Sequence, residues 1–163
     1  MHEDLLYNKI LLLSRNKFFY SQTNLKDSFQ NRINLIFIHI SFLFIKKKLS
    51  NKDSYHKFYQ KIFDLTFKKI EINMRELGFG DVTVNKNMKF LVKNFYNILL
   101  NCESYSKKTI KSKNIFFYNY LEKNDDKESD CEDLITYFDK YSSFCLDLSH
   151  DRVLKGELNF VLN

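Results

Sequence analysis

The four histidines are the side chains best suited to acid–base chemistry or metal binding in this chain. His39 lies inside the most apolar run of the sequence, where a histidine is more often a hydrogen-bonded core residue than a catalytic one. The others, which have no acidic or thiol companion at ligand spacing, are His2, His56 and His150. No G-x-S-x-G, HExxH or paired-carboxylate pattern is present. We therefore expect no catalytic residue and no metal site.

The three cysteines, Cys102, Cys131 and Cys145, are far apart and form no CxxC pair. This spacing fits neither a zinc site nor a framework of paired disulfides. Reduced thiols in a cytoplasm-like compartment are the expected state.

The segment LGFGD at residues 77–81 has the glycine content of a phosphate-binding loop. Such a loop follows a strand and carries a third glycine or a lysine, whereas this segment follows a long helical pattern and has neither. It is instead expected to connect two antiparallel helices, with Asp81 near the positive N-terminal end of the second helix.

Beyond this connection, Lys86, Lys89, Lys93 and Asn97 are offset by three, seven and eleven residues. On a helix these offsets give one stripe. The stripe is either an ordinary solvated face or a surface for an acidic partner. Because no aromatic residues alternate with the lysines, single-stranded nucleic acid is not specifically indicated.

Composition favours one helical domain. The chain has 163 residues, 44% of them hydrophobic, with no proline and only three glycines, so a core can form but tight β-turns are scarce. The net charge of +6 permits acidic partners. The abundance of Lys, Asn, Ile, Phe and Tyr is also the bias of an AT-rich genome, so the charge alone is not diagnostic.

The apolar run at residues 33–45 is too short to cross a membrane, which takes about 20 apolar residues. A run that is hydrophobic nearly all round is more typical of a helix buried by other helices than of one lying on a membrane surface. We expect an all-α, single-domain bundle of about six helices: a core over residues 5–122, a charged linker over 122–133, and a C-terminal helix and tail over 134–163.

Apolar residues at helical spacing, with capping residues and glycines, set the expected helix boundaries. Asp27 or Ser28 begins the helix that holds the apolar run, Gly78 ends the long helix that follows, and Thr83 caps the next. The expected ranges are 4–14, 28–49, 53–77, 83–102, 115–121 and 134–148.

Four segments, in this order, resemble the ubiquinol-cytochrome c chaperone family: LLYNKILLLSRNKFFY, NRINLIFIHISFLFIKK, MRELGFGDVTVNKNMKFLVKNFYNILL and GELNF. The most specific piece is MRELGFGDVTVNKNMK, in which a charged helix end, Gly-x-Gly-Asp and a basic helix start follow one another. The resemblance runs from about residue 5 to residue 160 and is thin after Asn101.

The resemblance implies a helical, noncatalytic and cofactor-free protein. Mitochondrial members assist assembly of respiratory complex III, hold newly made cytochrome b together with a small partner protein, and work near the ribosomal exit tunnel. The family-motif positions implied here are Tyr7, Arg15, Tyr20, Arg32, His39, Glu71, Glu76, Gly78 and Gly80. The expected partner-binding residues are Arg75, Asp81, Lys86, Lys89, Lys93 and Tyr96.

The chain departs from the family pattern at two places. FYNI at residues 95–98 stands where members often have Phe-Tyr-Gly-Arg, and Asn31 stands in place of the usual glycine. Both departures change the contacts expected at the surface more than the expected fold.

These features lead to the expectation of a complex III assembly chaperone, with an apolar groove and a basic rim, that binds newly made cytochrome b. A ribosome, a small partner protein and the periphery of a membrane are further expected contacts; no small-molecule substrate is expected. The alternative is a basic ribosome- or nucleic-acid-binding module without a client. The N-terminus resembles neither a secretory signal nor a transit peptide, so the bacterial cytoplasm is the expected location, with the mitochondrial matrix as the alternative.

Overall fold

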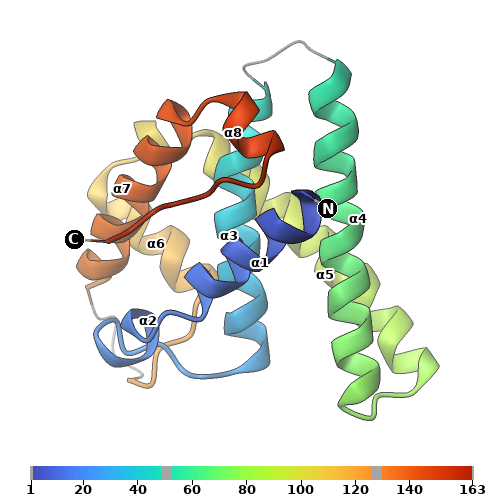
Figure 1. Ribbon diagram of the computed structural model, residues 1–163. Helices are drawn as coiled ribbons and strands as arrows, with labels where there is room; N and C mark the ends of the chain where they lie inside the picture. Colours follow the sequence, from blue (N-terminus) through green and yellow to red (C-terminus); the bar gives the residue numbers. More distant parts are fainter. Residues whose placement is uncertain (1, 49–52, 126–129, 163) are drawn as a thin grey trace.

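The helix that contains the apolar run, α3 (Phe29–Lys48), is the centre of the structure. The computed structural model describes residues 2–48, 53–125 and 130–162. Helix α3 packs against α1, α4, α5 and α7 (Figure 1). Between Ile33 and Phe44 every side chain is buried. The expectation of a buried helix is therefore confirmed.

The structure is an all-α, single-domain bundle, as expected. Within the described ranges, six helices of eleven residues or more form it, with two shorter ones: α1 (His2–Ser14), α2 (Phe18–Ser21), α3, α4 (Asp53–Glu76), α5 (Asp81–Glu103), α6 (Ile110–Tyr120), α7 (Glu132–Asp147) and α8 (His150–Leu154). A 3₁₀ turn, Tyr105–Lys107, separates α5 from α6.

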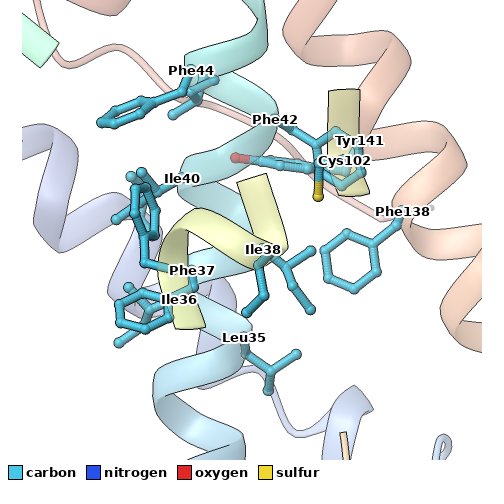
Figure 2. Packing of buried hydrophobic residues seen from close by; sticks show 14 of the residues in the cluster. Leu35, Ile36, Phe37, Ile38, Ile40, Phe42, Phe44, Cys102, Phe138 and Tyr141 are labelled. Atoms are coloured by element: carbon cyan, nitrogen blue, oxygen red, sulfur yellow. The ribbon is translucent and has the colours of Figure 1, made fainter. Parts of the chain in front are cut away.

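A local hydrogen bond marks the start of α3, and side chains of α5 and α7 cover the helix. The Ser28 hydroxyl oxygen accepts a hydrogen bond from the backbone N–H of Asn31 at 3.2 Å, which satisfies one of the unpaired donors of the first turn. Figure 2 shows side chains of α3 packed toward Phe138 and Tyr141 of α7, with Cys102 of α5 beside them.

Helices α4 and α5 form an antiparallel hairpin whose turn lies away from the other helices (Figure 1). Gly78 has a φ of +91°, and the N–H groups of Gly78 and Phe79 donate to the carbonyls of Arg75 and Met74. This left-handed glycine ends α4 as expected. The expected cap at Thr83 is wrong, because α5 already begins at Asp81, with Gly80 as its N-cap.

The C-terminal third closes the core beside α3. Thr109 caps α6 and Ser149 caps α8 through their hydroxyl oxygens. The segment after α8 runs back along α7, where the ring of Phe160 lies 5.5 Å from Tyr137 and 5.3 Å from Tyr141. Helix α8 was not expected, because five residues are too few to show helical periodicity.

The start of the expected charged linker, Glu122 and Lys123, forms hydrogen bonds with the chain around the start of α3. Leu25 and Lys123 form an antiparallel bridge. The Asn31 side chain donates to the Glu122 carbonyl at 2.7 Å and accepts from the Glu122 N–H at 2.9 Å. Residues 126–129 of the expected linker lie outside the described residues. The side-chain amide of Asn31 therefore joins two distant parts of the chain.

Two glycines with positive φ give a matched pair of stability predictions. A Cβ at Gly156 would lie 2.9 Å from the carbonyl oxygen of His2 and 3.1 Å from the Leu5 side chain, whereas a Cβ at Gly78 would meet nothing within 4 Å. Gly78→Ala is expected to cost about 1–2 kcal/mol for the left-handed backbone. Gly156→Ala is expected to cost about 2–4 kcal/mol, because overpacking is added. Urea denaturation of both variants checks this; equal losses would contradict the close approach of residue 156 to α1.

Candidate functional site

The turn between α4 and α5 is held by a cluster of charged side chains. The Arg75 guanidinium donates to the Glu71 carboxylate at 3.1 Å and to the Asp81 carboxylate. These two hydrogen bonds, that of Asp81 first, raise the pKa of Arg75. The structure thus brings Arg75 and Asp81 together. Because two carboxylates pair with Arg75, its charge is not free to attract a partner.

Gly80, a position marked by the resemblance, is not required by the fold. Its φ of −73° is open to any residue, and a Cβ there would meet nothing within 4 Å. Glu76 and Leu77 beside the turn are also exposed. The end of the hairpin is therefore a free surface.

Three lysines lie along the outside of α5. Lys86, Lys89 and Lys93 are all exposed, and no carboxylate of the described residues pairs with them. Between Asp81 and Glu103 the helix carries no acidic residue. Like charges a turn apart repel each other by a few tenths of a kcal/mol, so the stripe favours an anionic neighbour.

Exposed apolar side chains share this face of α5. Val82 is 83% exposed, Leu100 is 66% exposed and Tyr96 is 54% exposed, with its ring 5.9 Å from that of Phe63 on α4. We call Val82, Lys86, Lys89, Lys93, Tyr96 and Leu100 the α5 outer face. A helix face that mixes cations with exposed apolar side chains suits a partner that is apolar and carries acidic groups.

His39 is buried and serves the core. Its Nδ1 lies 2.6 Å from the Leu35 carbonyl oxygen, so Nδ1 carries the proton and Nε2 accepts from the Tyr137 hydroxyl at 2.8 Å. The Tyr141 hydroxyl donates to the His39 carbonyl at 2.9 Å. Burial lowers the pKa of His39 to about 4. The histidine therefore connects α3 to α7 as a neutral side chain.

The depressed pKa of His39 predicts a pH-dependent stability. The unfolded histidine gains a proton near pH 6.5 whereas the folded one does not until about pH 4, so stability is complete above 6.5 and falls as the pH drops between these values. From pH 7.5 to 5, His39 is expected to remove about 2 kcal/mol. Urea denaturation of the wild type and of His39→Gln at both pH values checks this. The same pH dependence in both proteins would contradict it.

All three cysteines are buried: Cys102, Cys131 and Cys145. Burial raises the pKa of Cys145 to about 12 and also raises the pKa of Cys102. A thiol that stays protonated is a poor nucleophile and a poor metal ligand. Within the described residues, no group of three histidine, cysteine or acidic side chains is placed to hold a metal ion.

Other positions marked by the resemblance gather where α1, α2 and α3 meet. Arg32 pairs with Asp27 through two hydrogen bonds of 2.7 and 3.0 Å. Burial raises the pKa of Tyr20, and the charges of Arg32 and Arg15 oppose this rise. Tyr7 is buried in α1. These residues are 40 or more positions before the α5 outer face in the sequence, and their roles in binding stay a prediction.

Sequence reasoning missed a cleft of about 500 Å³ between the start of α3, the middle of α5 and the end of α6. Side-chain amides and two exposed rings, Phe90 and Tyr118, line it. Its residues come from three distant segments, so no spacing rule would have grouped them. The one available signal was an aromatic residue, Phe90, beside the lysine stripe.

Comparison with known proteins places this fold in a family. The family described as Ubiquinol-cytochrome C chaperone matches residues 21–160. The chain belongs to this chaperone family. The crystal structure of the Cbp3 homolog from Brucella abortus is similar, with a TM-score of 0.83 and 22% identity over 98% of this chain and 88% of that chain. That likeness shows the shared fold. Curated protein sequences gave no match.

Membership in the ubiquinol-cytochrome c chaperone family confirms the resemblance found in the sequence. A chaperone family implies a protein client, which is what the α5 outer face could meet.

A further finding concerns the membrane. Among the described residues, no helix has both the length and the apolar character needed to span a bilayer.

Proposed function

We propose that this member of the chaperone family assists assembly of the cytochrome bc1 complex by binding newly made cytochrome b through the α5 outer face. Family membership supports the assembly role. The observation that carries the binding surface is the row of three lysines on α5, which pair with no carboxylate of the described residues and have exposed apolar side chains at both ends of the row. A membrane-protein client has apolar segments joined by polar loops, and this face offers partners to both.

The surface differs from the apolar groove expected from the sequence. The cleft between α3, α5 and α6 is lined by amide and charged side chains together with aromatic rings, whereas Val82, Tyr96 and Leu100 are exposed on the outside of α5. Client contact is therefore proposed on a convex helix face. Gly80, which the fold does not need, leaves room for a partner to approach the turn closely.

Tyr96 and Asp81 have separate parts in this proposal. Tyr96 gives the outer face an aromatic contact with a polar hydroxyl, which is common in protein interfaces. Asp81 holds Arg75 and so fixes the turn from which α5 starts. A small partner protein and the periphery of a membrane remain proposed contacts of the same region. The buried, protonated thiols and the neutral core histidine support a noncatalytic role.

Deletion of the gene tests the assembly role. Loss of the chaperone is expected to lower the amount of assembled complex III, measured on native gels and by its haem spectrum, and the wild-type gene is expected to restore it. Normal complex III in the deletion strain would contradict the assembly role. The reduced thiols of Cys102 and Cys145 suit the bacterial cytoplasm or the mitochondrial matrix, and the location is proposed accordingly.

A ribosome- or nucleic-acid-binding module is the alternative, and salt dependence distinguishes the two. Binding that neutralises about 6–10 phosphates falls by about 10³–10⁵ between 50 and 200 mM salt. Client binding through three lysines and apolar side chains is expected to fall much less. A steep salt response with RNA, together with no capture of cytochrome b, would favour the alternative.

A further inference from the structure

The cleft between α3, α5 and α6 has the size of a ligand site. Its volume of about 500 Å³ lies within the range of small-ligand pockets, about 300–1,000 Å³. Its walls carry the side-chain amides of Gln30, Asn34, Asn94 and Asn119, and the rings of Phe90 and Tyr118. None of these six residues belongs to the α5 outer face, so the cleft is a separate surface.

Three of the amides form a fixed array. The Asn34 side-chain oxygen accepts hydrogen bonds from Gln30 Nε2 at 3.0 Å and from Asn94 Nδ2 at 2.8 Å. Asn34 Nδ2 in turn donates to the Tyr120 carbonyl at 2.7 Å. These bonds hold the three amides in position from two different helices, before any ligand arrives. Preformed polar groups lower the entropic cost of binding.

The array keeps unused hydrogen-bonding capacity. Each amide has two N–H donors and one oxygen that accepts, and Gln30 and Asn94 each use only one donor toward Asn34. Within the part of the chain that the structure describes, the side-chain oxygens of Gln30 and Asn94 accept no hydrogen bond. The cleft therefore presents neutral acceptors and neutral donors side by side.

The charged side chains at one end of the cleft have partners of their own. Glu122 pairs with Lys26 at 3.1 Å, Lys123 donates to the Asp130 carbonyl at 2.9 Å, and Asp125 accepts from the Asn24 amide at 2.9 Å. Because Lys26 neutralises Glu122 and the remaining charges of Lys123 and Asp125 are opposite in sign, this end of the cleft has no net charge that would favour an anion or a cation. The ligand that fits is neutral and carries both donors and acceptors.

The two rings add an apolar contact at the edge of this neutral array. Phe90 is 59% exposed and Tyr118 is 63% exposed, and they come from different helices. Exposed rings that line one cleft are well placed to cover an apolar side chain of a ligand, since an aromatic ring buries 150–250 Å² when it is covered.

We propose that this cleft binds an extended polypeptide segment, with its backbone N–H and C=O groups on the amide array and one apolar side chain against Phe90 and Tyr118. An extended backbone is neutral, alternates donors and acceptors, and carries no sequence information in these groups. Backbone recognition of this kind suits a chaperone that holds a newly made chain, so the inference rests on the proposed function. Lys86 and Lys93 lie a helical turn to either side of Phe90, so the held segment continues onto the α5 outer face.

A labelled peptide tests the inference on the full-length protein. The probe is a capped octapeptide of glycine and serine with one central leucine, followed by fluorescence anisotropy. Phe90→Ala/Tyr118→Ala is expected to weaken binding by about tenfold or more, as truncation of aromatic interface residues does. Asn94→Ala is expected to weaken it by about fivefold, the effect of one hydrogen bond. Leu12→Ala, an exposed apolar residue of α1 outside both the cleft and the α5 outer face, is expected to bind normally.

A second probe isolates the backbone contacts. The same octapeptide with N-methyl groups at alternate residues keeps its side chains but loses half of its donors, and it is expected not to bind. Equal binding of the N-methylated probe, or unchanged binding by Phe90→Ala/Tyr118→Ala, would overturn the inference. Saturable binding of adenosine monophosphate in the cleft, with no binding of either peptide, would also overturn it. If the peptide fails to bind while gene deletion still lowers complex III, the cleft assignment fails and the proposed function stands.

Discussion

Replacing Phe138 with alanine is expected to lower the free energy of unfolding by about 3–5 kcal/mol, which is a large part of the stability of a domain this size. The ring is fully buried on α7. Its centroid lies 5.3 Å from that of Phe117 on α6, 6.0 Å from Phe42 on α3 and 6.1 Å from Phe19 on α2. Removal of this one ring leaves a cavity where four helices meet.

Phe90→Ala is the matched control for this truncation, because the same side chain is removed from an exposed position. It is expected to change the free energy of unfolding by less than about 0.5 kcal/mol. Urea denaturation followed by circular dichroism measures both variants. A loss below about 1 kcal/mol for Phe138→Ala would show that the α3–α7 junction is not the packed core described above.

Reversing the charges of the α5 stripe is expected to weaken client capture strongly. In Lys86→Glu/Lys89→Glu/Lys93→Glu, three attractive contacts become repulsive, and at about 0.5–1 kcal/mol per exposed charge the affinity should fall by about ten- to a hundredfold. The three side chains are exposed and pair with no carboxylate in the part of the chain that the structure describes, so the fold is expected to remain intact. Copurification of cytochrome b with the chaperone, at constant salt, is the measurement.

The control variant makes the same change in net charge at three lysines outside α5. Lys111→Glu/Lys140→Glu/Lys155→Glu changes three exposed lysines of α6, α7 and the end of α8. This variant is expected to capture cytochrome b nearly as well as the wild type. Equal losses in both triple variants would mean that net charge, and not the α5 outer face, attracts the client.

Much of the fold followed from patterns within single segments. The apolar run predicted the buried α3, and Gly78 predicted the end of α4, because each depends on the local chain alone. Helix α2 was missed, since four residues inside a polar stretch have no measurable period, although Phe19 is fully buried. The resemblance to the chaperone family added what no local pattern provides, namely a class of client.

Contacts between distant segments were beyond sequence reasoning. Lys46, the first of three lysines after the apolar run, is 8% exposed, and its ammonium donates to the Leu146 carbonyl at 2.6 Å. Lys46 thus caps the C-terminal end of α7, where a cation is favourable. It does not extend into solvent, as a lysine after an apolar run commonly does. The neutralisation of Arg75 and the assembly of the amide array depend in the same way on tertiary placement.

Site-specific crosslinking tests the central claim, that the α5 outer face binds newly made cytochrome b. A photoreactive amino acid is placed at Lys89 on α5 and, in a second protein, at the exposed Lys140 on α7, in cells that synthesise cytochrome b. We predict an adduct containing cytochrome b from position 89 and none from position 140. No adduct from position 89, or equal adducts from both positions, would contradict the claim.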